Sequence, residues 1–397
     1  MENNNDNKVL NVPHLRFPEF TDEWKESVLS DFVERVKRKN KNNLCKLPLT
    51  ISAQYGLVDQ ISFFNKVIAS ENMSNYYLLH KGDFAYNKSY SSEYPWGAIK
   101  RLDCYEQGTL SSLYICFKPY SHVSSDFLTH YFETSKWHQG ISEIAVEGAR
   151  NHGLLNVGIQ DFFETRHCLP QSLLEQEKIA KFLNLIEERI ATQNKIIEDL
   201  KKLKSAIIDQ LYSAIKGKGY SYRQIFEIVN ERNKQLEYSN ILSASQEKGM
   251  VNREDLNLDI QFERSNINTY KVVRKGDYVI HLRSFQGGYA FSDKIGVCSP
   301  AYTILRPNDL LEFRYLSYYF TSQKFIKSLI IVTYGIRDGR SINVEEWLDM
   351  KTTIPQKEQQ RHIVDTIRNI EKKIENEELY ASYLSKQKQY LLRQLFI

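Results

Sequence analysis

Two stretches of the chain place apolar residues at alternating steps of four and three positions, the heptad pattern of a helix that packs lengthwise against another helix. The first apolar seam consists of Ile179, Leu183, Ile186, Ile190, Ile197, Leu200, Ile207 and Leu211. The second consists of Ile363, Ile367, Ile370, Ile374, Ala381, Leu384, Leu391 and Leu395. Neither stretch contains Pro or Gly. The pattern predicts two long helices, over residues 171–216 and 356–397.

The second seam is a copy of the first. Each of its positions lies 184 residues after its counterpart, from Ile179 and Ile363 onwards. The polar interruptions keep the same spacing, because Gln193 and Lys204 correspond to Glu377 and Lys388. We infer a duplicated helix whose polar seam positions matter, for example in setting register.

A helix with such a seam needs a partner, and the nearest partner is its own copy. We therefore predict that the two helices pack as an antiparallel coiled coil. The alternative is that each seam packs only on the domain that precedes it.

The segments before the helices are also related. Residues 76–83 (YYLLHKGD) match residues 270–277 (YKVVRKGD), and both indicate a strand, a tight turn and a second strand. Gly82 and Gly276 are the predicted turn glycines. We expect an α+β fold with two mixed α/β domains, over 14–170 and 217–355, each followed by one long helix. Residues 1–13 are polar and predicted to be disordered.

Composition narrows the functional classes. The 397 residues carry a net charge of +4, which is compatible with a nucleic-acid partner but does not require one. The five cysteines are scattered without CxxC spacing, so neither a disulfide framework nor a zinc cluster is expected, and a reduced, cytoplasmic setting fits. The sequence shows no apolar run of membrane-spanning length and no signal peptide at its start.

Familiar catalytic motifs are missing from the sequence. It contains no Gly-Lys-Ser/Thr phosphate loop, no His-Glu-x-x-His metal site, no Gly-x-Ser-x-Gly elbow and no Pro-Pro dipeptide of an adenine-methyltransferase tetrapeptide. We therefore expect a binding protein that has no catalytic residues, metal or cofactor of its own.

Polar segments that recur in both halves are candidates for contacting DNA. One follows the KGD turn and mixes cations with groups that can pair with base edges; its candidates are Lys88, Ser89, Tyr90, Arg283, Ser284 and Gln286. Another is flanked by glycines, which let the backbone approach a surface closely; its candidates are Arg150, Asn151, His152, Arg337, Asp338 and Arg340. The alternatives are a solvated loop and an ordinary turn.

A basic run near the start of the first domain, residues 35–41, supplies the last candidates. Lys37 and Arg38 in this run suit contacts with phosphates, which hold a protein in register without reading sequence. The alternative is an exposed, charged helix end.

Several short motifs in this order resemble the specificity (S) subunit of type I restriction–modification systems. They are the opening at 15–20 (LRFPEF) with Glu23-Trp24, and Glu175-Gln176 and Gln359-Gln360 at the starts of the two helices, each followed by an Ile three residues later. Residues 88–102 also look like a stretch of such target-recognition domains. The resemblance covers nearly all of the chain after about residue 12. The chain departs from the family pattern at Gln359, where Glu is common.

The resemblance implies a function. Each domain would read one half of a bipartite target on double-stranded DNA, and the helices would set the gap between the halves. The implied partners are two methyltransferase (M) subunits, which use S-adenosylmethionine, and motor-nuclease (R) subunits, which use ATP and Mg²⁺. No membrane is involved.

Two other readings remain open on the sequence alone. One is a coiled-coil interaction scaffold whose two domains bind something other than DNA. The other is a self-contained enzyme with a degenerate site. A steep loss of DNA affinity with added salt would favour the recognition subunit over the scaffold.

Overall fold

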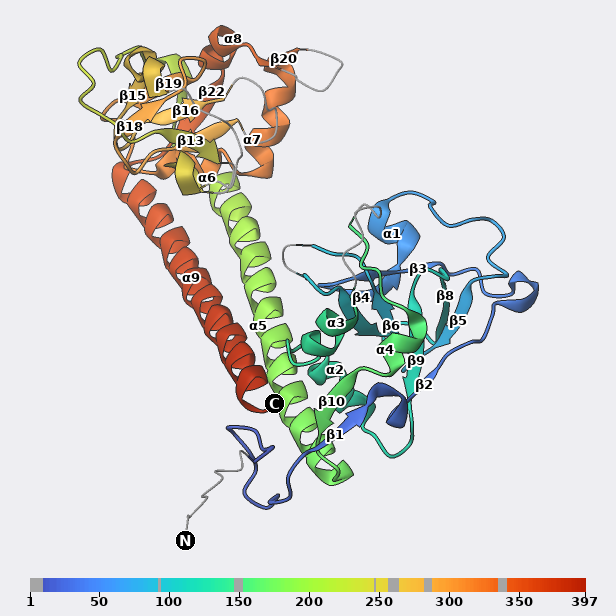
Figure 1. The fold of residues 1–397 in the computed structure, drawn as a ribbon. Helices are drawn as coiled ribbons and strands as arrows, with labels where there is room; N and C mark the ends of the chain where they lie inside the picture. Colours follow the sequence, from blue (N-terminus) through green and yellow to red (C-terminus); the bar gives the residue numbers. More distant parts are fainter. Residues whose placement is uncertain are drawn as a thin grey trace. The chain divides into compact units, whose positions relative to one another are not determined.

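The computed structural model describes residues 10–91, 94–145, 153–245, 248–255, 264–281, 288–334 and 341–397. The predicted disordered segment 1–13 lies mostly outside these residues. The chain divides into two compact units, Met1–Gln193 with Tyr380–Ile397, and Asn194–Leu379. Each unit contains one mixed domain and a part of both long helices (Figure 1).

The first unit is built around a four-stranded antiparallel sheet of order β2-β9-β6-β7. Its strands are β2 (Val33–Arg35), β9 (Ile115–Pro119), β6 (Phe84–Asn87) and β7 (Ala98–Arg101). Three antiparallel pairs surround it: β1 (Lys25–Val28) with β10 (Arg166–Leu169), β3 (Leu49–Ser52) with β4 (Gly56–Asp59), and β5 (Tyr77–His80) with β8 (Gln107–Leu110). The short helices are α1 (Gln60–Phe64), α2 (Ser125–Tyr131), α3 (His138–Ile144) and α4 (Ile159–Phe163).

The second unit repeats this arrangement strand for strand. Its four-stranded sheet has the order β12-β19-β16-β17, with β12 (Phe226–Val229), β19 (Thr303–Pro307), β16 (Tyr278–Ile280) and β17 (Tyr289–Phe291). The matching pairs are β11 (Lys218–Ser221) with β22 (Lys351–Ile354), β13 (Leu242–Ser245) with β14 (Gly249–Asn252), and β15 (Lys271–Val273) with β18 (Gly296–Cys298). The unit adds β20 (Thr333–Tyr334) paired with β21 (Ser341–Ile342), and the helices α6 (Tyr315–Tyr319), α7 (Gln323–Ser328) and α8 (Val344–Asp349). The duplication inferred from sequence is thus present in the strand pairing.

Short 3-10 helices connect several of these elements. They span Leu29–Asp31, Lys41–Asn43, Tyr222–Gln224, Arg253–Asp255, Arg264–Thr269 and Leu329–Val332. The KGD turns have the expected geometry, since Gly82 and Gly276 adopt φ angles of 90° and 97°, which an L side chain rarely adopts.

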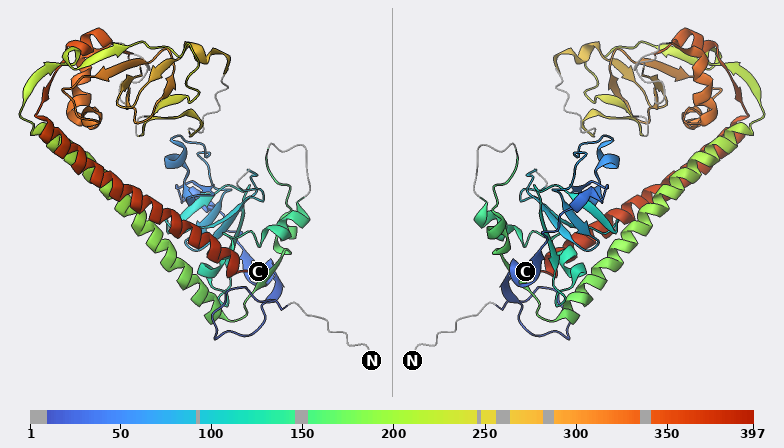
Figure 2. Two further views of the ribbon diagram at one scale, coloured as in Figure 1. Left: turned by 90° about the vertical axis from the view of Figure 1, so that its left-hand side faces the viewer. Right: turned by 90° about the vertical axis from the view of Figure 1, so that its right-hand side faces the viewer.

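The long helices are α5 (Leu173–Ser213) and α9 (Lys357–Gln394), and they pack antiparallel. In the first unit, the start of α5 contacts the end of α9, and Ile179 and Leu183 share a core with Leu391 and Leu395. In the second unit, the end of α5 meets the start of α9 (Figure 2). All sixteen seam positions named above are buried or half-buried. The predicted antiparallel coiled coil is confirmed, and the helix ends pack on the domains as well.

Each domain core is completed by the last turns of the helix that starts in the other unit. Phe396, near the end of the chain, is fully buried against Trp24, Phe127 and Tyr131 in the first unit. Its counterpart 184 residues earlier is Tyr212, which packs against tyrosines of α6 in the second unit. The core of the first unit therefore draws on both ends of the sequence.

A buried histidine distinguishes the two cores. His167 on β10 lies with Nδ1 2.9 Å from the Tyr131 hydroxyl and Nε2 2.8 Å from the Thr165 hydroxyl. Burial lowers the pKa of His167 to about 3, because the charged imidazolium would lose its hydration. The equivalent position on β22 is Thr352.

This difference predicts an acid sensitivity specific to the first unit. Below a pH of about 6.5 the unfolded chain binds a proton at His167 that the folded chain does not, so stability falls by up to about 1.4 kcal/mol per pH unit. Replacing His167 with the Thr of the second unit removes this contribution. Urea unfolding at pH 7.5 and 5, followed by tryptophan fluorescence, should show a smaller pH effect in His167→Thr than in the wild type. Equal losses in the two proteins would contradict it.

Candidate nucleic-acid interface

In the first unit, the candidate residues 88–90 pair with residues 153–155. Ser89 forms an antiparallel bridge with Leu154, and Lys88, Ser89 and Tyr90 follow directly after β6. The Tyr90 amide donates to the Gly153 carbonyl (2.7 Å), and the Leu155 amide donates to the Lys88 carbonyl (2.9 Å). The Asn87 side chain accepts from the Ser89 amide (3.0 Å). This pairing holds residues 88–90 beside the strand-like segment that follows candidates Arg150–His152.

The side chains at this pairing are available for binding. Tyr90 is 57% exposed and Leu154 is 44% exposed, while Ser89 is exposed and Lys88 half-buried. Gly153 adopts a φ of 81°, so a residue with a side chain would be strained there. The segment thus presents a cation, a hydroxyl and an aromatic ring on one short stretch, a combination suited to base edges and sugar–phosphate groups.

The other candidate segments lie outside the described residues, and only their flanks can be placed. This applies to Arg150, Asn151, His152, Arg283, Ser284, Gln286, Arg337, Asp338 and Arg340. The His281 amide donates to the Gly288 carbonyl (2.6 Å), at the two ends of the stretch that contains Arg283. The pair β20 and β21 flanks the stretch that contains Arg337.

The basic run separates into two kinds of residue. Lys37 is exposed and has no hydrogen-bond or ion-pair partner within the described part of the chain. Arg38 instead forms an ion pair with Asp83, the aspartate of the first KGD turn, and its Nε donates to the Leu78 carbonyl (3.4 Å). Lys37 therefore remains a candidate for a phosphate contact, whereas Arg38 has a structural partner.

The aspartates of the two KGD turns are buried and hold the turns through hydrogen bonds and ion pairs, a role that the sequence pattern alone does not indicate. Asp83 accepts from the His80 amide and Asp277 from the Arg274 amide, both at 2.8 Å. Burial raises the pKa of Asp83 above its usual value. Asp277 is held by the Arg306 guanidinium through two contacts of 2.9 Å. The repeated triplet was visible in the sequence, but its arginine partners come from non-equivalent positions.

The glutamines of the two helix-start motifs tie each helix to its domain. Gln176 donates to the Pro170 carbonyl and accepts from the Ser124 amide, both at 2.8 Å. Gln360 does the same with the Pro355 carbonyl (2.9 Å) and the Glu312 amide (2.8 Å). Both side chains are buried, so these bonds are shielded from water. The glutamine thus fixes the start of each long helix beside its domain.

The position before the glutamine differs between the halves for a structural reason. Glu175 is buried and binds Arg16 through two contacts of 2.7 and 2.9 Å, and it accepts from the Trp24 indole (3.1 Å). The equivalent Gln359 is exposed. The opening segment at 15–20 therefore has a partner in the first unit, where a buried carboxylate is needed.

Within the described residues, no group of three or more His, Cys, Asp or Glu side chains is arranged to hold a metal ion. The five cysteines are free thiols. No described helix combines the length and apolar character needed to cross a bilayer.

Solved structures share the fold of this chain. A chain from a type I restriction–modification system, solved to explain complex assembly and conformational transition, has a TM-score of 0.59 and 16% identity, and covers 94% of this chain and 97% of its own. The S subunit of a type I system from M. genitalium has a TM-score of 0.50 and 13% identity, with coverages of 97% and 99%. No family model matches the sequence, and no curated protein matches it significantly. At these identities the likeness establishes the fold alone, two mixed domains with a pair of long helices.

Lys37 and Arg38, which are neighbours in the basic run, offer a matched test. We expect Arg38→Ala to lower the free energy of unfolding by about 1–3 kcal/mol, because it leaves buried Asp83 without its cation. Lys37→Ala should change stability by less than about 0.5 kcal/mol, as at other exposed sites. Urea unfolding of both variants checks the contrast, and equal destabilisation by the two would refute it.

Proposed function

We propose that this chain is the DNA-recognition subunit of a type I restriction–modification complex. The observation that carries the proposal is the duplication: two domains of identical strand order are both built on the same antiparallel pair of helices. One chain thereby carries two copies of one domain, as dimeric DNA-binding proteins do with two chains. The shared fold of the solved subunits supports the same assignment.

In this proposal each domain reads one half of a bipartite target. The candidate loops of the two halves differ, with Lys88, Ser89 and Tyr90 in one and Arg283, Ser284 and Gln286 in the other. Different side chains pair with different base edges, so the two half-sites differ in sequence. The domain loops read bases, and exposed cations such as Lys37 hold phosphates.

The chemistry is supplied by partner subunits in the cytoplasm. Two methyltransferase subunits use S-adenosylmethionine to methylate adenine, and motor-nuclease subunits use ATP and Mg²⁺. The chain itself binds none of these cofactors and acts as the recognition component.

The direct test is to co-express the chain with its methyltransferase partner and map methylated adenines across the host genome. The expected result is one bipartite motif whose two halves change independently when the two domains are exchanged for others. A continuous motif, or methylation unaffected by deleting this chain, would overturn the proposal.

Salt dependence separates the recognition subunit from a scaffold whose domains bind something other than DNA. Affinity of the assembled complex for its target should fall steeply with added salt, because each phosphate contact releases about one counterion. Lys37→Ala should reduce the slope by about one. Fluorescence anisotropy between 50 and 200 mM salt, roughly the range over which such contacts are lost, measures both effects. Salt-independent binding would favour the scaffold.

The helices are proposed to set the gap between half-sites. Inserting four residues after Ile197 and four after Ala381, its counterpart in the seam, lengthens both helices by roughly 6 Å. At about 3.4 Å per base pair, we expect the preferred gap to grow by one or two base pairs while the half-sites stay the same. Genome-wide methylation mapping reads the gap directly, and an unchanged gap would count against this role of the helices.

A further inference from the structure

The lysines that interrupt the two seams form a duplicated ion pair. Lys388 Nζ lies 2.6 Å from Glu187 Oε1 in the first unit, and Lys204 Nζ lies 3.3 Å from Glu371 Oε1 in the second. Each pair joins a lysine of one long helix to a glutamate of the other. Both partners follow the 184-residue spacing, because Glu371 is the counterpart of Glu187 as Lys388 is of Lys204. The lysines of the two seams therefore bind a repeated partner.

The same glutamates also contact a short helix of the adjoining domain. In the second unit, the Tyr318 hydroxyl donates to Glu371 Oε2 (2.6 Å). In the first unit, His130 Nδ1 lies 3.7 Å from Glu187 Oε1. Tyr318 and His130 are the penultimate residues of α6 and α2. Each glutamate thus pairs with a lysine of the other long helix. Glu371 also accepts a hydrogen bond from a domain helix, whereas His130 Nδ1 lies near Glu187 but beyond hydrogen-bond distance.

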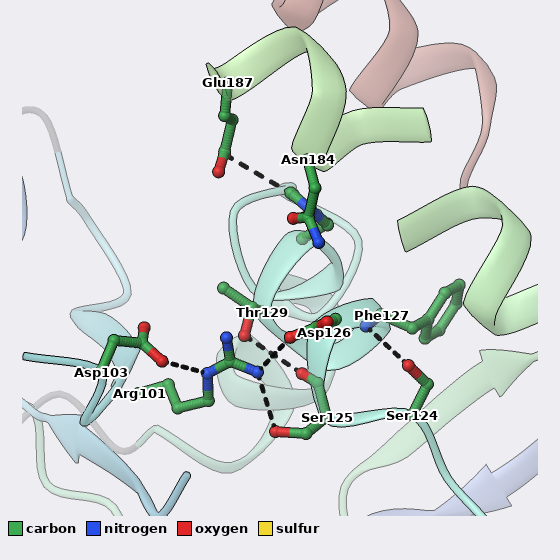
Figure 3. Close-up of polar contacts among 10 residues, drawn as sticks. Arg101, Asp103, Ser124, Ser125, Asp126, Phe127, Thr129, Asn184 and Glu187 are labelled. Carbon is green, nitrogen blue, oxygen red and sulfur yellow. Dashed lines mark hydrogen bonds and ion pairs between the residues drawn. The ribbon is translucent and has the colours of Figure 1, made fainter. Parts of the chain in front are cut away.

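In the first unit, α2 is in turn fixed to the sheet and to α5. Figure 3 shows Ser124 capping α2 and Arg101, the last residue of β7, bound to Ser125 and Asp126. His130 Nε2 lies 2.7 Å from Asn184 Oδ1 of α5. Because β7 pairs with β6, and β6 leads into Lys88, packed elements connect the glutamate to the candidate DNA-contacting segment.

Both partners are partly buried in the second unit, whereas only the lysine is in the first. The side chains of Lys388 and Glu371 are 16% and 26% exposed, and those of their partners Glu187 and Lys204 are 41% and 31% exposed. Shielding from water strengthens a charge pair and discourages alternative rotamers. Contacts of this kind restrain the angle between a domain and the helix pair. Apolar contacts have no preferred direction, so they restrain this angle less.

We propose that Glu187 and Glu371 are positioning residues that fix each domain on the helix pair and so make the complex strict about the gap between half-sites. This inference rests on the proposed function. Neither glutamate touches DNA: each acts through the domain helix that it holds.

The second unit offers the cleaner test, since Lys388 in the first also lies near Glu133 (3.9 Å). Glu371→Ala removes both contacts and keeps a strong helix former. The control is Glu375→Ala, an exposed glutamate one turn later on the same helix. The exchanged pair Lys204→Glu with Glu371→Lys restores the attraction with its sign reversed. Tyr318→Phe removes only the hydroxyl contact and serves as the milder variant should Glu371→Ala fail to fold.

The readout is methylation by the assembled complex on DNA with the native gap and with the gap changed by one base pair. We expect Glu371→Ala to reduce discrimination against the altered gap by about fivefold, the factor that roughly 1 kcal/mol represents. Tyr318→Phe should shift discrimination in the same direction, and the exchanged pair should restore it. Glu375→Ala should behave as the wild type.

Two results would overturn the positioning role while leaving the proposed function intact. One is wild-type discrimination in both Glu371→Ala and Tyr318→Phe. The other is equal relaxation by Glu375→Ala, which would indicate a general effect of helix charge. Failure of the proposed function is recognised separately, because the wild-type complex itself would then show no bipartite methylation.

Discussion

The packing of α5 against α9 is the constraint on which the rest of the structure depends. Each helix carries a long apolar seam whose exposure to water would be unfavourable, and the two seams bury one another. Because the pairing is antiparallel, the end of each helix reaches the start of the other. Both domains are consequently built on two helices rather than one.

This arrangement explains why residues far apart in the chain share a core. Phe396 fills the core of the first unit and Tyr212 that of the second, at equivalent points of the duplicated helix. The glutamines at the helix starts, Gln176 and Gln360, add a buried polar tie to each domain. Apolar burial supplies most of the stability, and the buried hydrogen bonds select one geometry among the many that apolar packing allows.

The two halves diverge where their surroundings differ. Glu175 is buried against Arg16 of the opening segment, whereas its counterpart Gln359 faces solvent. His167 is buried in the first unit, and the equivalent position in the second unit is Thr352. Such differences let one scaffold carry two domains whose cores and electrostatics are not alike.

The sequence by itself determined the periodic and local features, which are the two seams, their duplication, the turn glycines and the α+β class. These features depend on residues that are close together in the sequence. Only the tertiary structure decided which polar residues have partners. Arg38 lies in the same basic run as Lys37, yet it binds Asp83, 45 residues away, while Lys37 stays exposed. The pairing of residues 88–90 with 153–155, and of Lys204 with Glu371, likewise joins segments that no local pattern connects. Long-range polar contacts depend on how whole elements meet, and that is settled when the cores form.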